Sequence, residues 1–379
     1  MSMTKDVEIL VVGGGPAGLC AAKAAASMGA SVLVCERDET PGGQLVKQTH
    51  KFFGSRKQYA GDRGIAIGNF LLEEVKKESK VEVMSNTTVV AYFSDGMVLV
   101  EQKSADKNEF SKRTVFPIYP KKMIVATGAA EDFLAFPGND LPGIYGAGAV
   151  QTLMNVAGVV PGKRVLMIGA SNIGLIVSYQ LAQAGVEVAA VVRRSPTIGG
   201  FIVHASKIRR LGIPVRTRHT IKEAYGNGKV EGAIIYKMDD KKQPVPGSEE
   251  DIKCDTICLA VGLSPLTELC WQAGCKMAYI GELSGHVPIV DKFLQTTNPN
   301  VFVAGDVAGV EEASSAMVEG RLAGYSAALS LGYGKDAVPK LQAEALEELE
   351  ELRAGPVAEV IRKGVEKVEK LSGGFKNHG

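Results

Sequence analysis

Three glycines near the N-terminus have the spacing of a turn that holds a nucleotide. Gly13, Gly15 and Gly18 form the pattern G-x-G-x-x-G, and Glu36 follows 23 positions after the first of them. In such a turn the first glycine permits the tight bend, the second lets the backbone approach a pyrophosphate, and the third lets helix and strand pack closely. A carboxylate at the position of Glu36 can accept hydrogen bonds from a ribose diol. The chemistry indicated is the binding of an adenine dinucleotide.

The residues around this turn predict a strand, a helix and a second strand. Residues 9–12 are all apolar, an alanine-rich stretch runs from Pro16 to about Met28, and a second apolar run ends at Glu36. A helix that begins at the turn offers free N–H groups and positive potential to a phosphate. An ordinary glycine-rich turn that binds nothing is the alternative, and the strand, helix and acid together disfavour it.

The size and composition of the chain set limits on its class. With 379 residues it is long enough for two or three domains, and with 45% hydrophobic residues, 22% charged residues and a net charge of +1 it is typical of a globular protein. The charge balance gives no sign of a nucleic-acid surface. No apolar run reaches the roughly 18 to 20 residues of a membrane span, and the first strand begins at about Glu8, which leaves no room for a signal peptide. A cytoplasmic location without a membrane span is expected.

The cysteines predict no metal site. None of the six is spaced C-x-x-C, and Cys270 and Cys275 have no histidine or further cysteine at metal spacing. We interpret them as buried thiols.

The rest of the first half reads as a dinucleotide domain with an insertion. Gly43 and Gln44 follow in a glycine-rich loop that can run close to a flat ligand. A helix is expected near residues 64–78, and a β-meander over the short strands 81–83, 88–93, 97–102 and 113–119. A second buried strand begins at residue 122 and runs into the turn Ala126-Thr127-Gly128.

The pattern then repeats at a constant offset of 156 positions. Gly169 and Gly174 match the first and third glycines, while Ser171 replaces the second. Arg193 and Arg194 follow the position where the acid would stand. Arginines in place of a carboxylate suggest a 2′-phosphate, although two solvated arginines at a strand end are the alternative.

The chain ends with a second meander, a buried strand, a helix and a charged tail. A second meander is expected over residues 220–225, 229–237 and 251–261, followed by a turn at Gly262 that echoes Ala126-Thr127-Gly128. The buried strand 300–308 presents Asp306, and a helix runs from Glu312 to about Leu331. The tail beyond residue 335 is charged and helical in pattern, with an apolar stripe. This stripe comprises Leu341, Ala345, Leu349 and Leu352.

Residues 5–333 resemble the two-dinucleotide-domain flavoproteins of the pyridine nucleotide-disulfide oxidoreductase superfamily. The resemblance implies an α/β fold of two Rossmann-like dinucleotide-binding domains, each with an inserted β-meander, the second inserted into the first, and a helical C-terminal tail. Residues 1–134 and 283–335 would bind FAD, residues 135–282 would bind NAD(P)H, and 336–379 would form the tail. Asp306 would lie on the ribityl and pyrophosphate side of FAD.

The candidate cofactor-binding residues come from these motifs. They are Gly13, Gly15, Pro16, Ala17, Gly18, Glu36, Arg37, Gly43, Gln44, Ala126, Thr127, Gly128, Gly169, Ser171, Asn172, Ile173, Gly174, Arg193, Arg194, Gly262, Gly305, Asp306 and Ala313. The segment Val192-Arg193-Arg194 looks like the His-Arg-Arg of the thioredoxin reductase branch, which favours NADPH, although Ile198 stands where that pattern has a further arginine.

The redox-active cysteine pair of the disulfide reductases is missing. Neither residues 41–64 nor residues 143–169 contain a cysteine, and thiol–disulfide exchange needs such a pair. The chain looks closer to the FAD- and nucleotide-binding subunits of amine, opine, sarcosine and proline dehydrogenases and of hydrogen cyanide synthase. Some of these carry iron–sulfur ligands in a C-terminal cysteine cluster, but no cysteine follows Cys275 here.

Three functions remain open from the sequence. The first is an FAD-dependent NAD(P)H oxidoreductase that exchanges hydride with the flavin as one subunit of an amino, imino or hydroxy acid dehydrogenase. The second is a free-standing NAD(P)H oxidase or quinone reductase, and the third is a non-catalytic nucleotide-binding subunit. Lys47 and His50 are the candidate catalytic residues, with a structural role for His50 as the alternative. The apolar stripe of the tail would cover either a partner subunit or the chain's own flavin domain.

Overall fold

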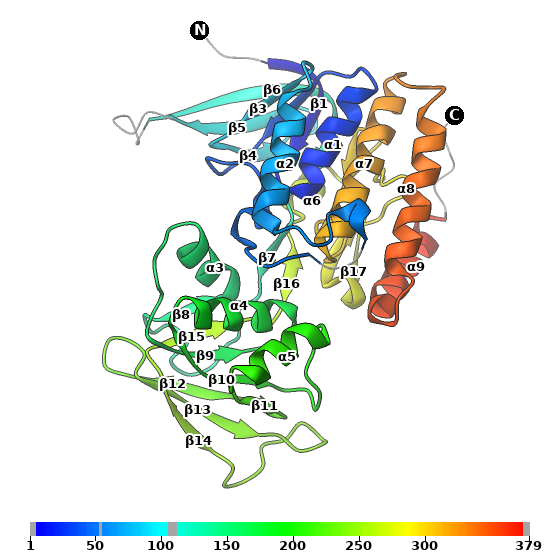
Figure 1. The fold of residues 1–379 in the computed structure, drawn as a ribbon. Helices are drawn as coiled ribbons and strands as arrows, with labels where there is room; N and C mark the ends of the chain where they lie inside the picture. Colours follow the sequence, from blue (N-terminus) through cyan, green and yellow to red (C-terminus); the bar gives the residue numbers. More distant parts are fainter. Residues whose placement is uncertain (1–4, 53–54, 105–111, 374–379) are drawn as a thin grey trace. The chain divides into compact units, whose positions relative to one another are not determined.

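The chain forms two units, and each unit has its own sheet with a parallel part (Figure 1). The computed structural model describes residues 5–52, 55–104 and 112–373. The chain divides into one unit formed by Met1–Ala130 and Ser264–Gly379, and a second formed by Glu131–Leu263. In sequence, the second unit is an insertion in the first.

The sheet of the first unit has the order β3-β2-β1-β6-β5-β4, with β19 beside β6. Strands β1, β2, β3 and β19 run parallel to their neighbours, whereas β4, β5 and β6 form an antiparallel meander. The strands are β1 (Lys5–Val12), β2 (Val32–Cys35), β3 (Val81–Met84), β4 (Thr87–Tyr92), β5 (Val98–Lys103), β6 (Arg113–Val125) and β19 (Val301–Val303).

Two sequence predictions are corrected in this sheet. Residues 81–84 do not join the meander, because β3 pairs with β2 in the parallel part. The strands expected at 113–119 and from 122 are one strand, β6. Ile118 pairs with Val98 of β5 on one side and with Lys5 of β1 on the other, so the strand continues from the meander into the parallel sheet without a break.

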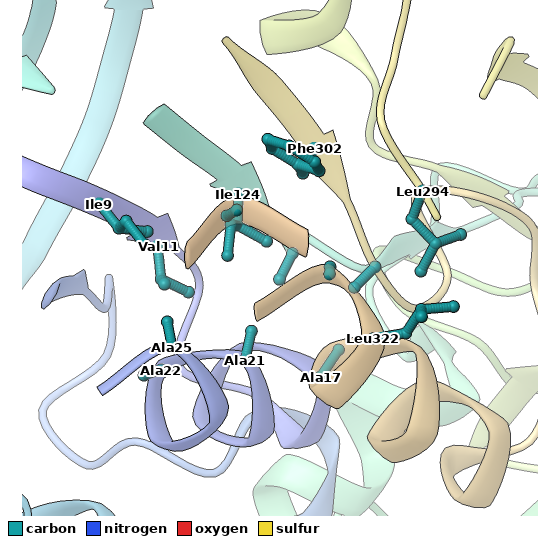
Figure 2. Close-up of a cluster of buried hydrophobic side chains, with 14 of the residues drawn as sticks. Ile9, Val11, Ala17, Ala21, Ala22, Ala25, Ile124, Leu294, Phe302 and Leu322 are labelled. Atoms are coloured by element: carbon teal, nitrogen blue, oxygen red, sulfur yellow. The ribbon is translucent and has the colours of Figure 1, made fainter. Parts of the chain in front are cut away.

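Helices α1 (Pro16–Ser27) and α7 (Ala313–Ser330) pack closely against each other. A Cβ at Gly320 would lie 2.1 Å from the carbonyl oxygen of Ala17, and one at Gly324 would lie 2.3 Å from that of Ala21. Figure 2 shows the alanines of α1 beside Leu322 of α7, with the sheet residues around Ile124 on the other side. Small residues on both helices thus allow their backbones to approach.

The first unit also contains short helices and strands outside this sheet, together with helices α2, α8 and α9. They are η1 (Gly43–Lys47), η2 (Arg56–Gln58), α2 (Gly64–Lys76), α6 (Glu268–Gln272), β17 (Met277–Ile280), η4 (Gly281–Leu283), β18 (Gly285–Pro288), α8 (Val338–Arg353), η5 (Pro356–Ala358) and α9 (Glu359–Ser372). No helix in the described ranges is long and apolar enough to cross a bilayer.

The tail is part of the first unit. Helix α8 packs along α7 and buries Val338, Ala345 and Leu349, and α9 packs against η4. The apolar stripe predicted at 341–352 therefore covers the chain's own unit, which is the second of the two alternatives that the sequence left open. Residues 374–379 lie outside the described part.

The second unit has a parallel sheet of order β11-β10-β9-β15-β8 and an antiparallel meander β12-β13-β14. The strands are β8 (Ile144–Gly146), β9 (Arg164–Ile168), β10 (Glu187–Arg193), β11 (Val215–Thr217), β12 (His219–Tyr225), β13 (Gly232–Lys237), β14 (Glu250–Lys253) and β15 (Thr256–Leu259). The helices are α3 (Ala147–Asn155), α4 (Asn172–Gln183) and α5 (Ile202–Arg210).

One predicted strand is two strands here. The run 251–261 contains β14 in the meander and β15 in the parallel sheet. Asp255 separates them, and its carboxylate accepts hydrogen bonds from the backbone N–H groups of Lys163 and Arg164.

The boundaries between the units differ from the predicted ones. Strands β7 (Ala129–Glu131) and β16 (Leu263–Pro265) pair where the chain passes from one unit to the other. Residues 264–282 were expected in the second domain but belong to the first unit, because Leu269 and Cys270 are buried with Val98 and Val100 of β5. The mixed α/β class is confirmed.

Candidate functional site

Three motifs meet at the carboxyl edge of the first parallel sheet. Strands β1, β6 and β19 are neighbours, and their ends lead into Gly13, Ala126 and Gly305. The Ala126 N–H donates to the Val12 carbonyl at 2.9 Å, and the Ala304 N–H donates to the Val125 carbonyl at 3.1 Å. Ligands of open parallel sheets bind outside this edge.

The first turn requires glycine at two positions. Gly13 has φ of 102°, and a Cβ there would lie 2.4 Å from the Ala126 carbonyl oxygen. A Cβ at Gly18 would lie 1.9 Å from the Gly13 carbonyl oxygen. Both contacts are with backbone, which cannot move aside. Together they seat the N-terminus of α1 on the end of β1.

Gly15 is different, because nothing in the chain requires it to be glycine. Its φ of −73° and ψ of −175° are open to any residue, and its Cβ would meet nothing closer than the Cα of Gly43 at 3.8 Å. No side chain caps the first turn of α1. A backbone that is open in front of an uncapped helix N-terminus fits a pyrophosphate. A Cβ at Gly128 would likewise meet no described atom within 4 Å, so the backbone is open there too.

Glu36 is a buried carboxylate held by backbone at this edge. Its two oxygens accept hydrogen bonds from the N–H groups of Gly14 at 2.7 Å and Asp38 at 2.8 Å. Burial raises the pKa of Glu36. Each oxygen keeps a second lone pair, which suits the hydroxyls of a ribose. Arg37 beside it is exposed and pairs with Asp38 at 3.5 Å.

Asp306 is a half-buried carboxylate that has few partners among the residues the structure describes. Burial raises its pKa to about 6, and the nearby Glu311 and Glu312 add to this rise. Its carboxylate accepts a long hydrogen bond from the Glu311 N–H, at 3.4 Å. An ionised carboxylate can accept several hydrogen bonds through its two oxygens. A ligand with hydroxyl groups would supply further donors, so the Asp306 site fits such a ligand.

The other residues predicted for this site lie around the same edge. Pro16 and Ala17 form the first turn of α1, Gln44 is exposed in η1, and Ala313 begins α7. Thr127 uses its hydroxyl within the chain, where it donates to the Leu266 carbonyl at 2.7 Å.

The candidate catalytic residues lie just after the glycine loop. Lys47 ends η1, and the ring of His50 stacks on Phe52 with their centroids 5.9 Å apart. The Gly64 N–H donates to the His50 carbonyl at 3.3 Å. The structure assigns neither residue a chemical role.

The second unit repeats the geometry of the first turn. Gly169 has φ of 117°, and its Cβ would lie 2.1 Å from the Ala260 carbonyl oxygen. A Cβ at Gly174 would lie 2.2 Å from the Gly169 carbonyl oxygen. Ser171 has φ of −78° and ψ of −180°, the same extended conformation as Gly15. The serine is therefore accommodated without strain.

A loop closes over the start of α4. The Phe201 N–H donates to Asn172 Oδ1 at 2.8 Å, and a Cβ at Gly200 would lie 2.8 Å from the Asn172 backbone nitrogen. Ile173 follows in the first turn of α4 and is half-buried. At the neighbouring strand end, a Cβ at Gly262 would lie 2.3 Å from the Asp132 carboxylate.

Arg193 lies across this loop with an unsatisfied donor. Its guanidinium passes so close to Gly199 that a Cβ there would lie 2.5 Å from Nη1. Within the described ranges the buried Nε of Arg193 has no hydrogen-bond partner, and burial lowers the pKa of the guanidinium. An anion would satisfy this group. Arg194 next to it is exposed. The sequence analysis did not select Gly199 and Gly200. A glycine pair six residues after Arg193 could have indicated a loop that packs against this side chain.

All six cysteines are buried free thiols. Burial raises the pKa of Cys20, Cys35 and Cys254 to about 12, and it raises that of Cys258 further. Cys270 and Cys275 lie in the core of the first unit. A hydrogen bond with Cys270 lowers the pKa of Cys275. Among the residues that the structure describes, no group of three His, Cys, Asp or Glu could hold a metal ion.

Known sequences that are similar to this chain include components of two oxidases. One subunit of the opine oxidase of Agrobacterium tumefaciens (strain Ach5) is 28% identical over 337 residues, which cover 86% of this chain and 66% of the relative. The alpha subunit of the sarcosine oxidase of Rhizobium meliloti (strain 1021) is 29% identical over 282 residues, which cover 73% of this chain and 26% of the relative. The chain spans less than two thirds of either relative.

The fold is shared with a solved enzyme. The thioredoxin reductase of T. acidophilum superposes with a TM-score of 0.68 at 22% identity, over 86% of this chain and 98% of that chain. This likeness shows the fold alone. It confirms the predicted architecture of two dinucleotide-binding domains.

A family profile covers the turn of the first unit, the whole second unit and Asp306. Residues 7–320 match the family described as pyridine nucleotide-disulphide oxidoreductase, which implies FAD and a nicotinamide nucleotide as cofactors. The matched residues include both glycine-rich turns and Asp306. This chain belongs to the pyridine nucleotide-disulphide oxidoreductase family.

Proposed function

We propose that this chain passes hydride between a nicotinamide nucleotide and FAD without a redox disulfide, as one subunit of an enzyme that oxidises an amino, imino or hydroxy acid. One observation carries the proposal. The turn geometry of Gly13, Gly18 and Ala126 recurs at Gly169, Gly174 and Ala260, while residues 41–64 and 143–169 contain no cysteine. Two nucleotide sites without a thiol pair favour direct transfer between the cofactors.

The first unit would hold FAD, which supplies a two-electron acceptor when bound. The open backbone at Gly15 and the N-terminus of α1 would face the pyrophosphate. Glu36 would accept hydrogen bonds from the adenosine ribose, and Asp306 from the ribityl hydroxyls. The start of α7 would direct its positive end toward the charge that develops on reduction.

The second unit would hold the nicotinamide nucleotide. The turn from Gly169 to Gly174 would receive its pyrophosphate, and Arg193 with Arg194 would bind a 2′-phosphate. The unsatisfied Nε of Arg193 supports a preference for NADPH. Without a phosphate, that donor has no partner among the residues that the structure describes.

The proposal of a complex is based on the relatives. The opine oxidase and sarcosine oxidase relatives are each named as one subunit of an oxidase, and both are longer than this chain. Oxidation of the organic substrate would take place on a second subunit. Lys47 and His50 remain the candidates for proton transfer in this chain, because each lies close to the glycine loop in sequence.

Anaerobic mixing of the isolated chain with NADPH or NADH tests the proposal. The flavin absorbance should bleach within seconds, and faster with NADPH. Addition of oxygen or a quinone should restore it only slowly, since the natural exchange partner is another subunit. Rapid turnover with either acceptor would favour a free-standing oxidase or quinone reductase instead. A flavin that neither nucleotide bleaches would contradict the proposal and favour a non-catalytic role.

A further inference from the structure

A buried ion cluster joins helix α8 to the segment that carries Asp306. Arg353 is the last residue of α8. Its Nε donates to Glu311 at 2.8 Å, and its Nη2 donates to Glu319 at 2.6 Å. The side chain of Arg353 is 15% exposed, and each carboxylate side chain is 9% exposed. One guanidinium therefore bridges two acids away from water.

Both acids are connected to the segment of residues 305–311. The second oxygen of Glu319 accepts a hydrogen bond from the Gly305 N–H at 2.9 Å. Glu311 ends the segment, and its N–H points to Asp306 at 3.4 Å. Arg353 thus fixes the start of the segment through Glu319 and its end through Glu311 directly. Asp306 lies between the two fixed points.

Docking of α8 on α7 does not account for this cluster. Val338, Ala345 and Leu349 already bury the apolar face of α8. A separate ion pair between Arg321 of α7 and Glu348 of α8 joins the same helices at a more exposed place. Burying three charges costs more in lost hydration than one ordinary ion pair recovers, so such a cluster is weak support for helix docking alone.

The end of α8 is itself held in place. Arg362 of α9 donates to the carbonyl oxygens of Arg353 and of Gly355, the latter at 2.9 Å. The guanidinium of Arg353 also keeps Glu311 and Glu319 from acting as two uncompensated negative charges beside Asp306. A buried group of three acids would repel a pyrophosphate and one another.

We propose that Arg353 is a positioning residue for FAD, which holds residues 305–311 so that Asp306 meets the ligand. This rests on the proposed FAD site of the first unit. Helix α8 would then be required for flavin affinity as well as for the fold. Arg353 acts through Glu311 and Glu319 and touches no reacting atom.

The variant Arg353→Met tests this inference against Arg321→Met as its matched control. Both changes remove one arginine from the contact between α7 and α8, but only the first reaches residues 305–311. The full chain is purified with FAD, and three properties are measured. They are the FAD dissociation constant, the visible circular dichroism of the bound flavin, and hydrogen exchange of the peptide that contains residues 305–311.

Arg353→Met should weaken FAD binding at least tenfold, alter the flavin dichroism and speed exchange in residues 305–311. Arg321→Met should leave all three near the wild-type values. Equal effects of the two variants would overturn the inference, because Arg353 would then only dock the helix. If Arg353→Met does not fold, Glu311→Gln replaces it, since this change keeps the volume and removes one charge of the cluster. A wild-type chain that binds no FAD would refute the proposed function, and the exchange comparison would still decide whether Arg353 orders the segment.

Discussion

Gly18 lies against the carbonyl oxygen of Gly13, where an added Cβ would stand 1.9 Å from that oxygen. Gly174 has the same relation to Gly169, at 2.2 Å. In each unit this contact seats a helix directly on the end of its strand, so that the helix N-terminus opens at the edge of the sheet. The repeat of 156 positions in the sequence is therefore a repeat of one packing contact.

Replacement of Gly15 by valine should remove FAD and leave the fold intact. The backbone at Gly15 is extended, and an added Cβ would lie no closer than 3.8 Å to the atoms that the structure describes. It would instead fill the space proposed for the pyrophosphate. The purified variant should be colourless, with the melting temperature of the flavin-free wild type. Gly18→Val, by contrast, should not fold. A Gly15→Val chain with its full flavin content would contradict the assignment.

The double change Arg193→Ala with Arg194→Ala should reduce the preference for NADPH over NADH. Two arginines on one phosphate contribute on the order of 1.5 to 3 kcal/mol, or about ten- to a hundredfold. The ratio of the two rates of flavin reduction measures this preference. Arg210→Ala at the exposed end of α5 is the control. An unchanged ratio in the double variant would show that these arginines are only surface charges.

Asp306→Asn should stabilise the flavin-free chain at neutral pH. Burial raises the pKa of Asp306 to about 6, from 3.8 in the unfolded chain. Between these two pKa values the folded state holds the proton more tightly than the unfolded state does. The free energy of unfolding therefore falls as the pH rises through 6, by at most about 3 kcal/mol. Urea unfolding should show the variant as the more stable chain near about pH 8, and a smaller difference near about pH 5. The same difference at both values would contradict this account.

Leu349→Ala should destabilise the chain, because α8 is part of the first unit. Leu349 is 4% exposed and packs in the cluster that contains α1 and α7. Loss of a buried leucine costs about 2 to 5 kcal/mol. Thermal unfolding measures this, with Leu371→Ala on α9, where the side chain is 46% exposed, as the control.

Deletion of residues 336–379 should likewise cause the chain to lose its flavin or to aggregate. A truncated chain that keeps both its flavin and its stability would refute the role given to the tail.

The residues of the site that lie close together in the sequence could be predicted from it. Gly13, Gly18 and Glu36 form a short-range pattern, because a strand, turn and helix impose fixed spacings. The ion cluster was not readable. Arg353 lies 42 positions from Glu311, and the tail offers many equally charged residues, so no periodic signal selects this pair.

The boundary after the second unit was misplaced for a similar reason. The segment 264–282 follows the turn at Gly262 without a break in composition. Its membership is decided by the burial of Leu269 and Cys270 against β5, a contact between residues far apart in the chain. The two alternatives for the tail stay open in the sequence, because its apolar stripe is the same whether it packs on α7 or on another protein.

The number of NADPH molecules needed to bleach the flavin tests the central claim most directly. FAD accepts two electrons, and a redox disulfide would accept two more. An anaerobic titration of the purified chain should end at one NADPH per FAD. An endpoint at two NADPH per FAD that falls to one in the variant Cys270→Ser with Cys275→Ser would show a working cysteine pair, and it would contradict transfer without a disulfide.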